Sequence, residues 1–202
     1  MMVSIIDSET CNLFSIKNAL EKVGAKTNVV SNYKDLNEAN ALVLPGVGSF
    51  KEAMSNLKKK KLIKPILNHI NSNKKFLGVC LGFQLLFETS EEFGKSKGLG
   101  VLKGKIKSFE KKKINSIPHV GWNLVNFKNK NFSSKKNELF YFVHSFYVEP
   151  KEKKIVSSTT NLDGFNFCSS IIYKNIFGCQ FHPEKSGEKG LNFLKKFIEI
   201  KC

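Results

Sequence analysis

The sequence predicts an α/β fold: a mostly parallel sheet flanked by helices, with antiparallel strands added in the second half of the chain. Three observations lead to this prediction. Up to residue 88, short apolar runs alternate with segments of helical spacing. Beyond that point, short β-branched and aromatic runs follow one another with turn residues between them. An amphipathic segment over residues 190–200 closes the chain as a helix.

The elements of the first half follow from their capping and stop residues. Strands are expected over residues 2–7, 27–31, the run that starts at 41, and 75–79. Helices are expected from the capping Asn12 to Gly24, from the capping box Ser49 with Glu52, over 62–70, and over 81–88. Because strand alternates with helix, we expect a parallel sheet that is covered on both faces.

The second half reads as added antiparallel strands. These are expected over residues 100–109, 122–127, 138–148, 154–160, 167–173 and 176–181. No internal repeat, low-complexity linker or composition change divides the chain. We therefore expect residues 1–202 to form a single domain of ordinary size.

The charge of the chain is strongly basic, at +16, yet all 33 basic residues are Lys and none is Arg. Proteins that bind phosphates and guanines rely heavily on Arg, whose fork binds two acceptors at once. The lysines are also scattered along the chain rather than gathered in one stripe. Nucleic-acid binding is thus disfavoured, and an acidic protein partner is the better use of this charge.

Cysteine usage and hydropathy indicate the compartment. The five cysteines form no CxxC pair, so neither a disulfide framework nor a zinc site is predicted. No apolar run reaches the ~18 residues of a membrane span. The N-terminus lacks the basic region of a signal peptide. A reducing cytoplasm is the expected location.

Cys80 stands between Gly78 and Gly82, where an apolar run gives way to helical spacing. The spacing is that of the G-x-S-x-G elbow, in which a tight, strained turn holds a nucleophile out into a cleft. A helix N-terminus there would favour thiolate over thiol, and the N–H of Leu81 would point to where an oxyanion forms. A buried core cysteine in a glycine-tolerant turn is the other interpretation.

A nucleophilic cysteine needs a base, and the base needs a group that orients it. Of the four histidines, His182 lies at a strand end in "GCQFHPEKS", with Glu184 two residues on. On extended chain these two side chains can point the same way. Cys80, His182 and Glu184 are therefore the candidate catalytic triad.

These residues carry a resemblance. "GVCLGFQLLFE" with "FHPEKS" resembles the class I (triad) glutamine amidotransferases, and so implies their flavodoxin-like fold. "LPGVGSF", "IPHVGWN" and "YFVHSFYV" fall in the order typical of one family within that class, the glutaminase subunits of imidazole glycerol phosphate synthase. The resemblance covers nearly the whole chain, from Ile5 to the last helix.

The resemblance implies hydrolysis of L-glutamine to glutamate and ammonia, without metal or cofactor. Cys80 would form a γ-glutamyl thioester, His182 would move the protons, and Glu184 would orient His182. Ammonia would pass through a tunnel to a (β/α)₈-barrel cyclase, the partner in a heterodimer that forms imidazole glycerol phosphate and AICAR in histidine biosynthesis.

Further roles come from the same resemblance. The N–H groups at Val47, Gly48 and Leu81 would form the oxyanion hole, the first two by a peptide flip when the partner is occupied. The expected glutamine-binding residues are Gly46, Gln84, His144, Ser145 and Phe146. The expected partner-interface residues are Asn12, Trp122, Asn123 and Lys185.

One segment departs from the family pattern. After the first strand the family usually reads Asp-Tyr-Gly-x-Gly-Asn, whereas this chain reads "DSETCN" from Asp7 to Asn12. The altered residues Ser8–Cys11 lie on the family's partner side, so the departure concerns the partner rather than the triad.

Three alternatives remain at this point. The first is a second-copy paralogue that supplies ammonia for amidination of a surface-polysaccharide sugar, which the altered loop favours. The second is a stand-alone cysteine hydrolase on a similar sheet, which would be fully active without a partner. The third is a non-enzymatic binding subunit, against which the complete triad and "PGVGSF" both argue.

Overall fold

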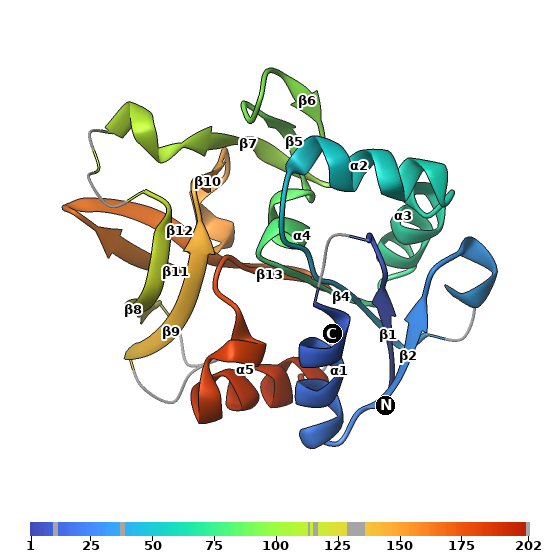
Figure 1. Ribbon diagram of the computed structural model, residues 1–202. Coiled ribbons are helices and arrows are strands. Elements are labelled where there is room, and N and C mark those ends of the chain that lie inside the picture. Colours follow the sequence, from blue (N-terminus) through green and yellow to red (C-terminus); the bar gives the residue numbers. More distant parts are fainter. Residues whose placement is uncertain (10–11, 37–38, 113, 115–116, 129–135, 201–202) are drawn as a thin grey trace.

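The computed structural model describes residues 1–9, 12–36, 39–112, 114, 117–128 and 136–200. Within these ranges, thirteen strands form one sheet (Figure 1). Its main path runs β2-β1-β3-β4-β13-β12-β10-β7-β5-β6, and a branch of β11, β8 and β9 leaves it at β12. None of the helices in these ranges is both long and apolar enough to cross a bilayer.

Five neighbouring strands form the parallel half of the sheet. In spatial order they are β2 (Lys26–Val30), β1 (Met2–Ile6), β3 (Ala41–Leu44), β4 (Lys75–Val79) and β13 (Ile176–Cys179). One face carries α1 (Leu13–Lys22) and α5 (Gly187–Glu199), and the other carries α2 (Phe50–Lys59) and α3 (Ile63–Asn71). This arrangement confirms the predicted α/β fold.

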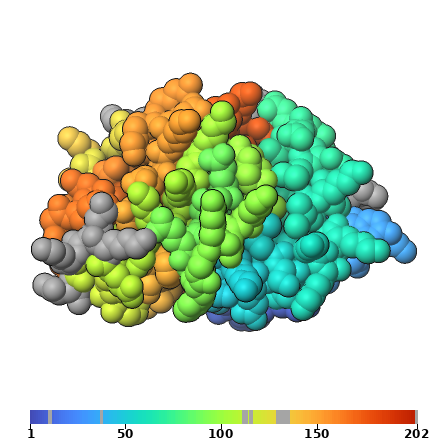
Figure 2. Space-filling model, turned by 90° about the horizontal axis from the view of Figure 1, so that it is seen from above, coloured from blue at the N-terminus to red at the C-terminus, as the bar shows by residue number. Residues whose placement is uncertain are grey.

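Alternate strand residues build the two apolar layers of the core. Val3 and Ile5 point toward the layer of α1 and α5, whereas Leu42 and Leu44 point toward the layer of α2 and α3. The space-filling view from above shows α2, α3 and the β5–β7 segment side by side over the second layer (Figure 2). The first layer continues into the aromatic residues of the second half.

The second half supplies most of the antiparallel strands, as predicted. On the main path these are β12 (Phe165–Tyr173), β10 (Phe146–Pro150) and β7 (Leu102–Ser108). Two earlier strands end this path, β5 (Phe87–Ser90), which pairs in parallel with β7, and β6 (Ser96–Lys97), which pairs antiparallel with β5. The branch consists of β11 (Val156–Leu162), β8 (His119–Phe127) and β9 (Asn137–His144). Short helices complete the described chain: α4 (Leu81–Gln84), η1 (Tyr33–Leu36), η2 (Phe109–Lys112), η3 (Lys153–Ile155) and η4 (Pro183–Lys185).

Three expectations were wrong in detail. The strand expected over 138–148 is interrupted at Ser145 and forms two strands, β9 and β10. The run 176–181 was expected to be an antiparallel strand, but β13 pairs in parallel with β4 and antiparallel only with β12. The helix expected over 81–88 ends at Gln84, because Phe87 and Glu88 belong to β5. There the buried Phe87 ring packs edge-on against Phe83, and the Glu88 carboxylate accepts the N–H of Gly104 at 2.9 Å.

The parallel half determines where a site can form. The carboxyl ends of β1, β3, β4 and β13 meet at one edge of the sheet, which is where open α/β sheets bind ligands. The segments that follow these ends carry Asp7, Gly46, Cys80 and His182 respectively. Residues far apart in sequence are thereby brought to a common edge.

The elbow after β4 depends on two close backbone approaches. A Cβ added at Gly82 would lie 1.7 Å from the carbonyl oxygen of Leu44, and one at Gly78 would lie 2.7 Å from the Cα of Phe83. Both contacts are with backbone, which cannot move away cheaply. Glycine at these positions is thus required by packing, in addition to any role in catalysis.

We therefore expect Gly82→Ala to lower the free energy of unfolding by about 3 kcal/mol or to prevent folding, as overpacking of a dense core does. The measurement is urea unfolding followed by circular dichroism. Gly164→Ala is the matched control, because its added Cβ would meet nothing within 4 Å and only its φ of +85° is unfavourable. The control should cost about 1 kcal/mol. Equal costs for the two variants would contradict this explanation.

Candidate active site

Cys80 occupies the sharp turn from β4 into α4 that its flanking glycines predict. Its φ of 53° and ψ of −109° lie in a region that residues with side chains seldom adopt. Two backbone hydrogen bonds hold this turn: Cys80 N donates to Cys179 O at 2.8 Å, and Leu81 N donates to Gly46 O at 3.3 Å. The strained residue is thus fixed from both β13 and the segment after β3.

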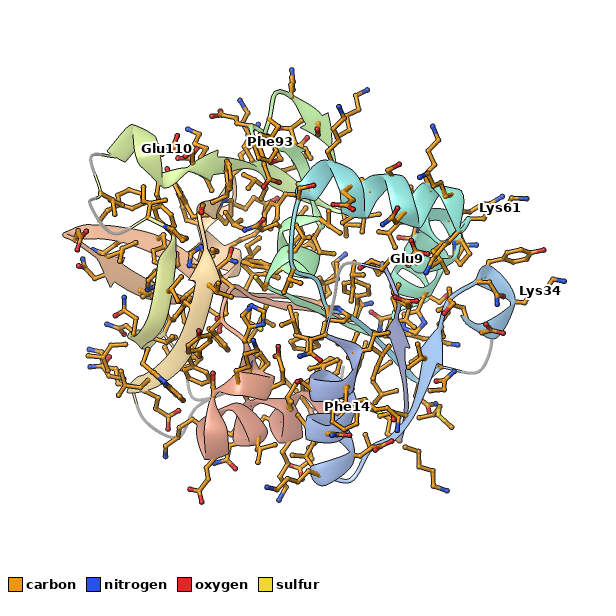
Figure 3. All side chains as sticks on the ribbon, viewed as in Figure 1. Glu9, Phe14, Lys34, Lys61, Phe93 and Glu110 are labelled. Atoms are coloured by element: carbon orange, nitrogen blue, oxygen red, sulfur yellow. The ribbon has the colours of Figure 1, made fainter. Side chains whose placement is uncertain are left out.

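Cys80 lines a cleft of about 520 Å³. Eight other predicted site residues line it too: Val47, Gly48, Leu81, Gln84, His144, Ser145, Phe146 and Lys185. Sequence reasoning missed four lining residues: Glu92, Phe93, Pro118 and Val143. Phe93 is 84% exposed beside this cleft, in the turn between β5 and β6 (Figure 3). The acidic run "SEE" before Phe93 is the signal that could have found Glu92.

His182 and Glu184 form the hydrogen bond that their spacing predicts. His182 Nδ1 lies 2.7 Å from Glu184 Oε1, and both side chains are almost fully buried. His182 N donates to Tyr141 O at 2.9 Å, which ties this segment to β9. Among the described residues, His182 Nε2 has no hydrogen-bond partner, so this nitrogen is available for a proton.

Electrostatics favour a charged His182. Burial lowers the pKa of His182, whereas the nearby Cys80 sulfur and the Glu184 carboxylate raise it, and the net pKa is about 10. Nδ1 is the nitrogen bound to Glu184, so Nε2 is the nitrogen that gains or loses the second proton. His182 is thereby suited to hold a proton beside the Cys80 sulfur.

Gln84 lies one turn after Cys80 and lines the cleft, as expected. Its Nε2 donates to Phe146 O at 3.1 Å and to Gln180 Oε1 at 3.0 Å, which uses both amide hydrogens. Gln180 was not predicted, yet its Nε2 lies 3.6 Å from Cys80 Sγ. Its sequence signal is only its position two residues before His182.

His144 forms part of a buried histidine pair. His144 Nδ1 lies 2.8 Å from Phe146 O, which can only accept, so a neutral His144 must use Nε2 as acceptor. His119 Nδ1 donates to that Nε2 at 2.9 Å, and Asn123 Nδ2 donates to His119 Nε2 at 3.2 Å. Burial lowers the pKa of His119 to about 4 and that of His144 to about 3, so both rings are neutral near pH 7.

The predicted oxyanion donors are not all free. The N–H of Leu81 is donated to Gly46 O, so it does not point to an empty position in this structure. Gly48 has a φ of +90°, and a Cβ added there would meet nothing within 4 Å. The segment around Val47, which is 41% exposed, is therefore free to rotate a peptide while Gly46 stays against the elbow.

Three of the predicted interface residues, Asn12, Trp122 and Lys185, are exposed, and the fourth, Asn123, is partly buried. Trp122 is 56% exposed on β8, and Lys185 lies 5.9 Å over the ring of Tyr141 beside the cleft. Asn123, by contrast, points inward and binds His119 and the carbonyl of Asn161. Asn12 is exposed and caps α1, accepting the N–H of Ser15 at 3.2 Å.

The altered loop after β1 is held by Lys60, which follows α2. Lys60 Nζ lies 2.9 Å from Asp7 O and 3.1 Å from a carboxylate oxygen of both Asp7 and Glu9. Glu9 has a φ of 62°, a left-handed conformation that favours glycine. The Lys60 ion pairs thus hold a glycine-like turn without glycine. Thr10 and Cys11 lie outside the described residues.

The other described cysteines are packing residues. Burial raises the pKa of Cys168 to about 12 and the pKa of Cys179 well above its usual value. Over the described ranges, no three His, Cys, Asp or Glu side chains are grouped so as to hold a metal ion. Cys80 is therefore the described cysteine suited to chemistry at the cleft.

The fold and the elbow define an amidotransferase. The family model "Glutamine amidotransferase class-I" matches residues 4–200, and the chain belongs to this family. The predicted resemblance to class I glutamine amidotransferases is thereby confirmed.

The relatives give a finer comparison. The chain is 45% identical over 205 residues to "Imidazole glycerol phosphate synthase subunit HisH" of Caldanaerobacter subterraneus, covering 100% of both chains. It is 45% identical to the subunit of the same name from Aquifex aeolicus, covering 98% of this chain and 96% of that one. Among solved structures, "Structure of PurLQS from Thermotoga maritima" matches with a TM-score of 0.77 at 20% identity, covering 98% of this chain and 97% of that one. This structural match supports the fold.

The neutral histidine pair leads to a pH prediction. Their pKa values are about 4 and 3 in the folded protein against 6.5 unperturbed, so below pH 6.5 the unfolded chain binds more protons. The free energy of unfolding should therefore decrease as the pH falls from 6.5 to 4.5. In His119→Phe, whose ring can keep the stack on Phe142, this decrease should be smaller by about 1–2 kcal/mol.

The measurement is urea unfolding at a series of pH values for wild type and His119→Phe. Titration of carboxylates is common to both proteins and cancels in the comparison. Identical pH slopes for the two proteins would show that His119 is not held neutral by the fold.

Proposed function

We propose that this protein is the glutaminase subunit of an imidazole glycerol phosphate synthase and supplies ammonia for histidine biosynthesis. The observation that carries the proposal is the assembly of Cys80, His182 and Glu184 at the edge where β4 and β13 end. The names and the full-length coverage of the relatives support the particular pathway.

The cleft suits glutamine. We expect the Glu92 carboxylate, whose Oε2 accepts the N–H of Phe50, to bind the α-ammonium group through its other oxygen, and Gln84 to offer its Oε1, because both hydrogens of its Nε2 are used. Gly46, Ser145 and Phe146 would contact the substrate mainly through backbone. The walls are closed by apolar side chains such as Phe93 and Pro118.

The proposed reaction begins at Cys80. The thiol proton of Cys80 passes to His182 Nε2, and Sγ attacks the amide carbon of glutamine. Collapse of the tetrahedral intermediate releases ammonia, which takes its proton from His182, and leaves a γ-glutamyl thioester. His182 then activates a water that releases glutamate and restores the thiol. Glu184 holds the Nδ1 hydrogen throughout.

Completion of the oxyanion hole is the step that a partner can control. While Leu81 N–H is bound to Gly46 O, the intermediate lacks that donor. Removal of one such donor costs about 10²–10³ in rate. A peptide rotation at Val47 and Gly48 would supply the missing N–H. The isolated chain should accordingly be a slow enzyme.

The expected partner is a (β/α)₈-barrel cyclase in a cytoplasmic heterodimer, to which residues 1–202 contribute a single domain. The surface supports a protein partner, because apolar side chains on β8 and β9 are half exposed beside the cleft. These residues are Val120, Trp122, Leu124 and Leu139. The excess of lysine over acidic residues favours an acidic partner surface.

The polysaccharide-pathway paralogue is not supported. The relatives compared above carry the name of the histidine-pathway subunit, and the loop that suggested another partner keeps a glycine-like turn at Glu9.

The test is glutamate release from L-glutamine by the purified chain, alone and with the histidine-pathway cyclase of the same organism and its nucleotide substrate. We expect slow release by the chain alone and an increase of about 10²-fold or more with the occupied cyclase, as one restored oxyanion donor provides.

Cys80→Ala is the blank and should be inactive under both conditions. Full activity without the cyclase would indicate a stand-alone hydrolase and contradict the proposal. Activity that is unchanged by the cyclase but lost in Cys80→Ala would retain the glutaminase chemistry and exclude this pathway.

A further inference from the structure

We propose that Gln180 is a further catalytic residue, whose side-chain amide donates a hydrogen bond to Cys80 Sγ and favours the thiolate before glutamine binds. The inference deepens the proposed function and rests on Cys80 being its nucleophile. Gln180 is fully buried in the segment that joins β13 to His182, and its backbone N–H donates to Ser169 O at 2.9 Å.

Besides His182, two polar groups lie within hydrogen-bond reach of the sulfur. Gln180 Nε2 lies 3.6 Å from Sγ, and the carbonyl oxygen of Val143 lies 3.8 Å from it. A thiol donates one hydrogen, which Val143 O accepts. A thiolate can only accept, so it is stabilised by Gln180 and not by Val143. The two contacts therefore favour opposite protonation states of the same atom.

The direction of the Gln180 amide is set by a backbone carbonyl. Phe146 O can only accept, so the atom of Gln84 that faces it must be the donor Nε2. The same Nε2 faces Gln180 at 3.0 Å, so the Gln180 atom there must be the acceptor Oε1. The other end of the Gln180 amide, the donor Nε2, then necessarily faces Cys80 Sγ.

The Phe146 carbonyl is itself fixed. It accepts a second hydrogen bond from His144 Nδ1 at 2.8 Å, and His144 is held in this tautomer by His119. Both histidines are neutral near pH 7, because burial lowers the pKa of each. The polarity of the Gln180 amide thus follows from groups that do not change their protonation during the reaction.

Apart from His182, the other candidate donors near Cys80 are poorly placed to stabilise a thiolate. α4 spans only four residues, so few aligned peptides contribute to a dipole at Cys80. The N–H of Leu81 is used by Gly46 O. His182 receives the thiol proton, and it gives that proton up when ammonia leaves. Gln180 is a neutral donor that stays in place through every step.

The test uses two variants of the full chain. Gln180→Met keeps the approximate length of the side chain and removes the donor. Gln180→Glu keeps the shape and still accepts from Gln84, but it presents an oxygen to the sulfur in place of the N–H. Comparison of the two separates loss of the donor from loss of packing.

The readout is alkylation of Cys80 by iodoacetamide as a function of pH, measured by mass spectrometry. Cleavage after lysine yields the peptide 76–95, in which Cys80 is the sole cysteine. The reagent reacts with thiolate, so its rate follows the thiolate fraction. The assay requires neither glutamine nor a partner, so it can fail or succeed independently of the proposed pathway.

We expect the pH of half-maximal alkylation to rise by about one unit in Gln180→Met, with an approximately tenfold lower rate at any pH well below the midpoint. Gln180→Glu should show a larger rise. Asn175→Ala is the matched control, since it removes another buried amide, which binds the Ile70 and Lys74 carbonyls, and it should leave the alkylation profile unchanged.

Folding of each variant is checked by circular dichroism. If one of the two Gln180 variants does not fold, the alkylation profile of the other tests the proposal. The proposal would be overturned if the pH of half-maximal alkylation in the folded variants lay within ~0.3 unit of the wild-type value. It would also be overturned by a rise in Asn175→Ala equal to that in Gln180→Met, because the effect would then be one of general destabilisation.

Discussion

The left-handed backbone of Cys80 is the constraint on which the rest of the structure depends. A φ of 53° is unfavourable for cysteine, and it persists because the chain on both sides is fixed. Gly82 lies against the Leu44 carbonyl, and Cys80 N is bound to β13. The same contacts bring together the ends of β3, β4 and β13, which carry the proposed oxyanion segment, nucleophile and base. Strain at one residue is thus the local consequence of close packing among three strands.

Two sets of polar groups with opposite properties surround this residue. On one side, His182 and Glu184 form a charged pair, and the net pKa of His182 is about 10. On the other side, His144 and His119 are held neutral, with pKa values of about 3 and 4. In the proposed reaction the first set moves protons, whereas the second fixes the direction of the hydrogen bonds that reach Gln84 and Gln180. Burial alone lowers the pKa of all three histidines, so the nearby sulfur and carboxylate account for the difference at His182.

Much of this could be predicted from the sequence, because the signals are local. The glycines around Cys80 and the spacing of His182 and Glu184 predict a turn and an extended pair that need no knowledge of distant residues. The direction of β13 and the contacts of Gln180 could not be predicted in this way. The first depends on which strand β13 pairs with, and the second on a bond between residues about a hundred positions apart. Glu92 was missed for the same reason, since it enters the cleft from a turn with no catalytic motif of its own.

The central claim is that the elbow presents Cys80 as the nucleophile toward a bound glutamine. The most direct measurement is covalent labelling with an electrophilic glutamine analogue, such as a diazoketone, followed by mass mapping of peptide 76–95. This account predicts one label per chain, located on Cys80, with loss of glutaminase activity in proportion and protection by excess glutamine. Complete inactivation with the label on another residue, or labelling of Cys80 that leaves the activity intact, would contradict it.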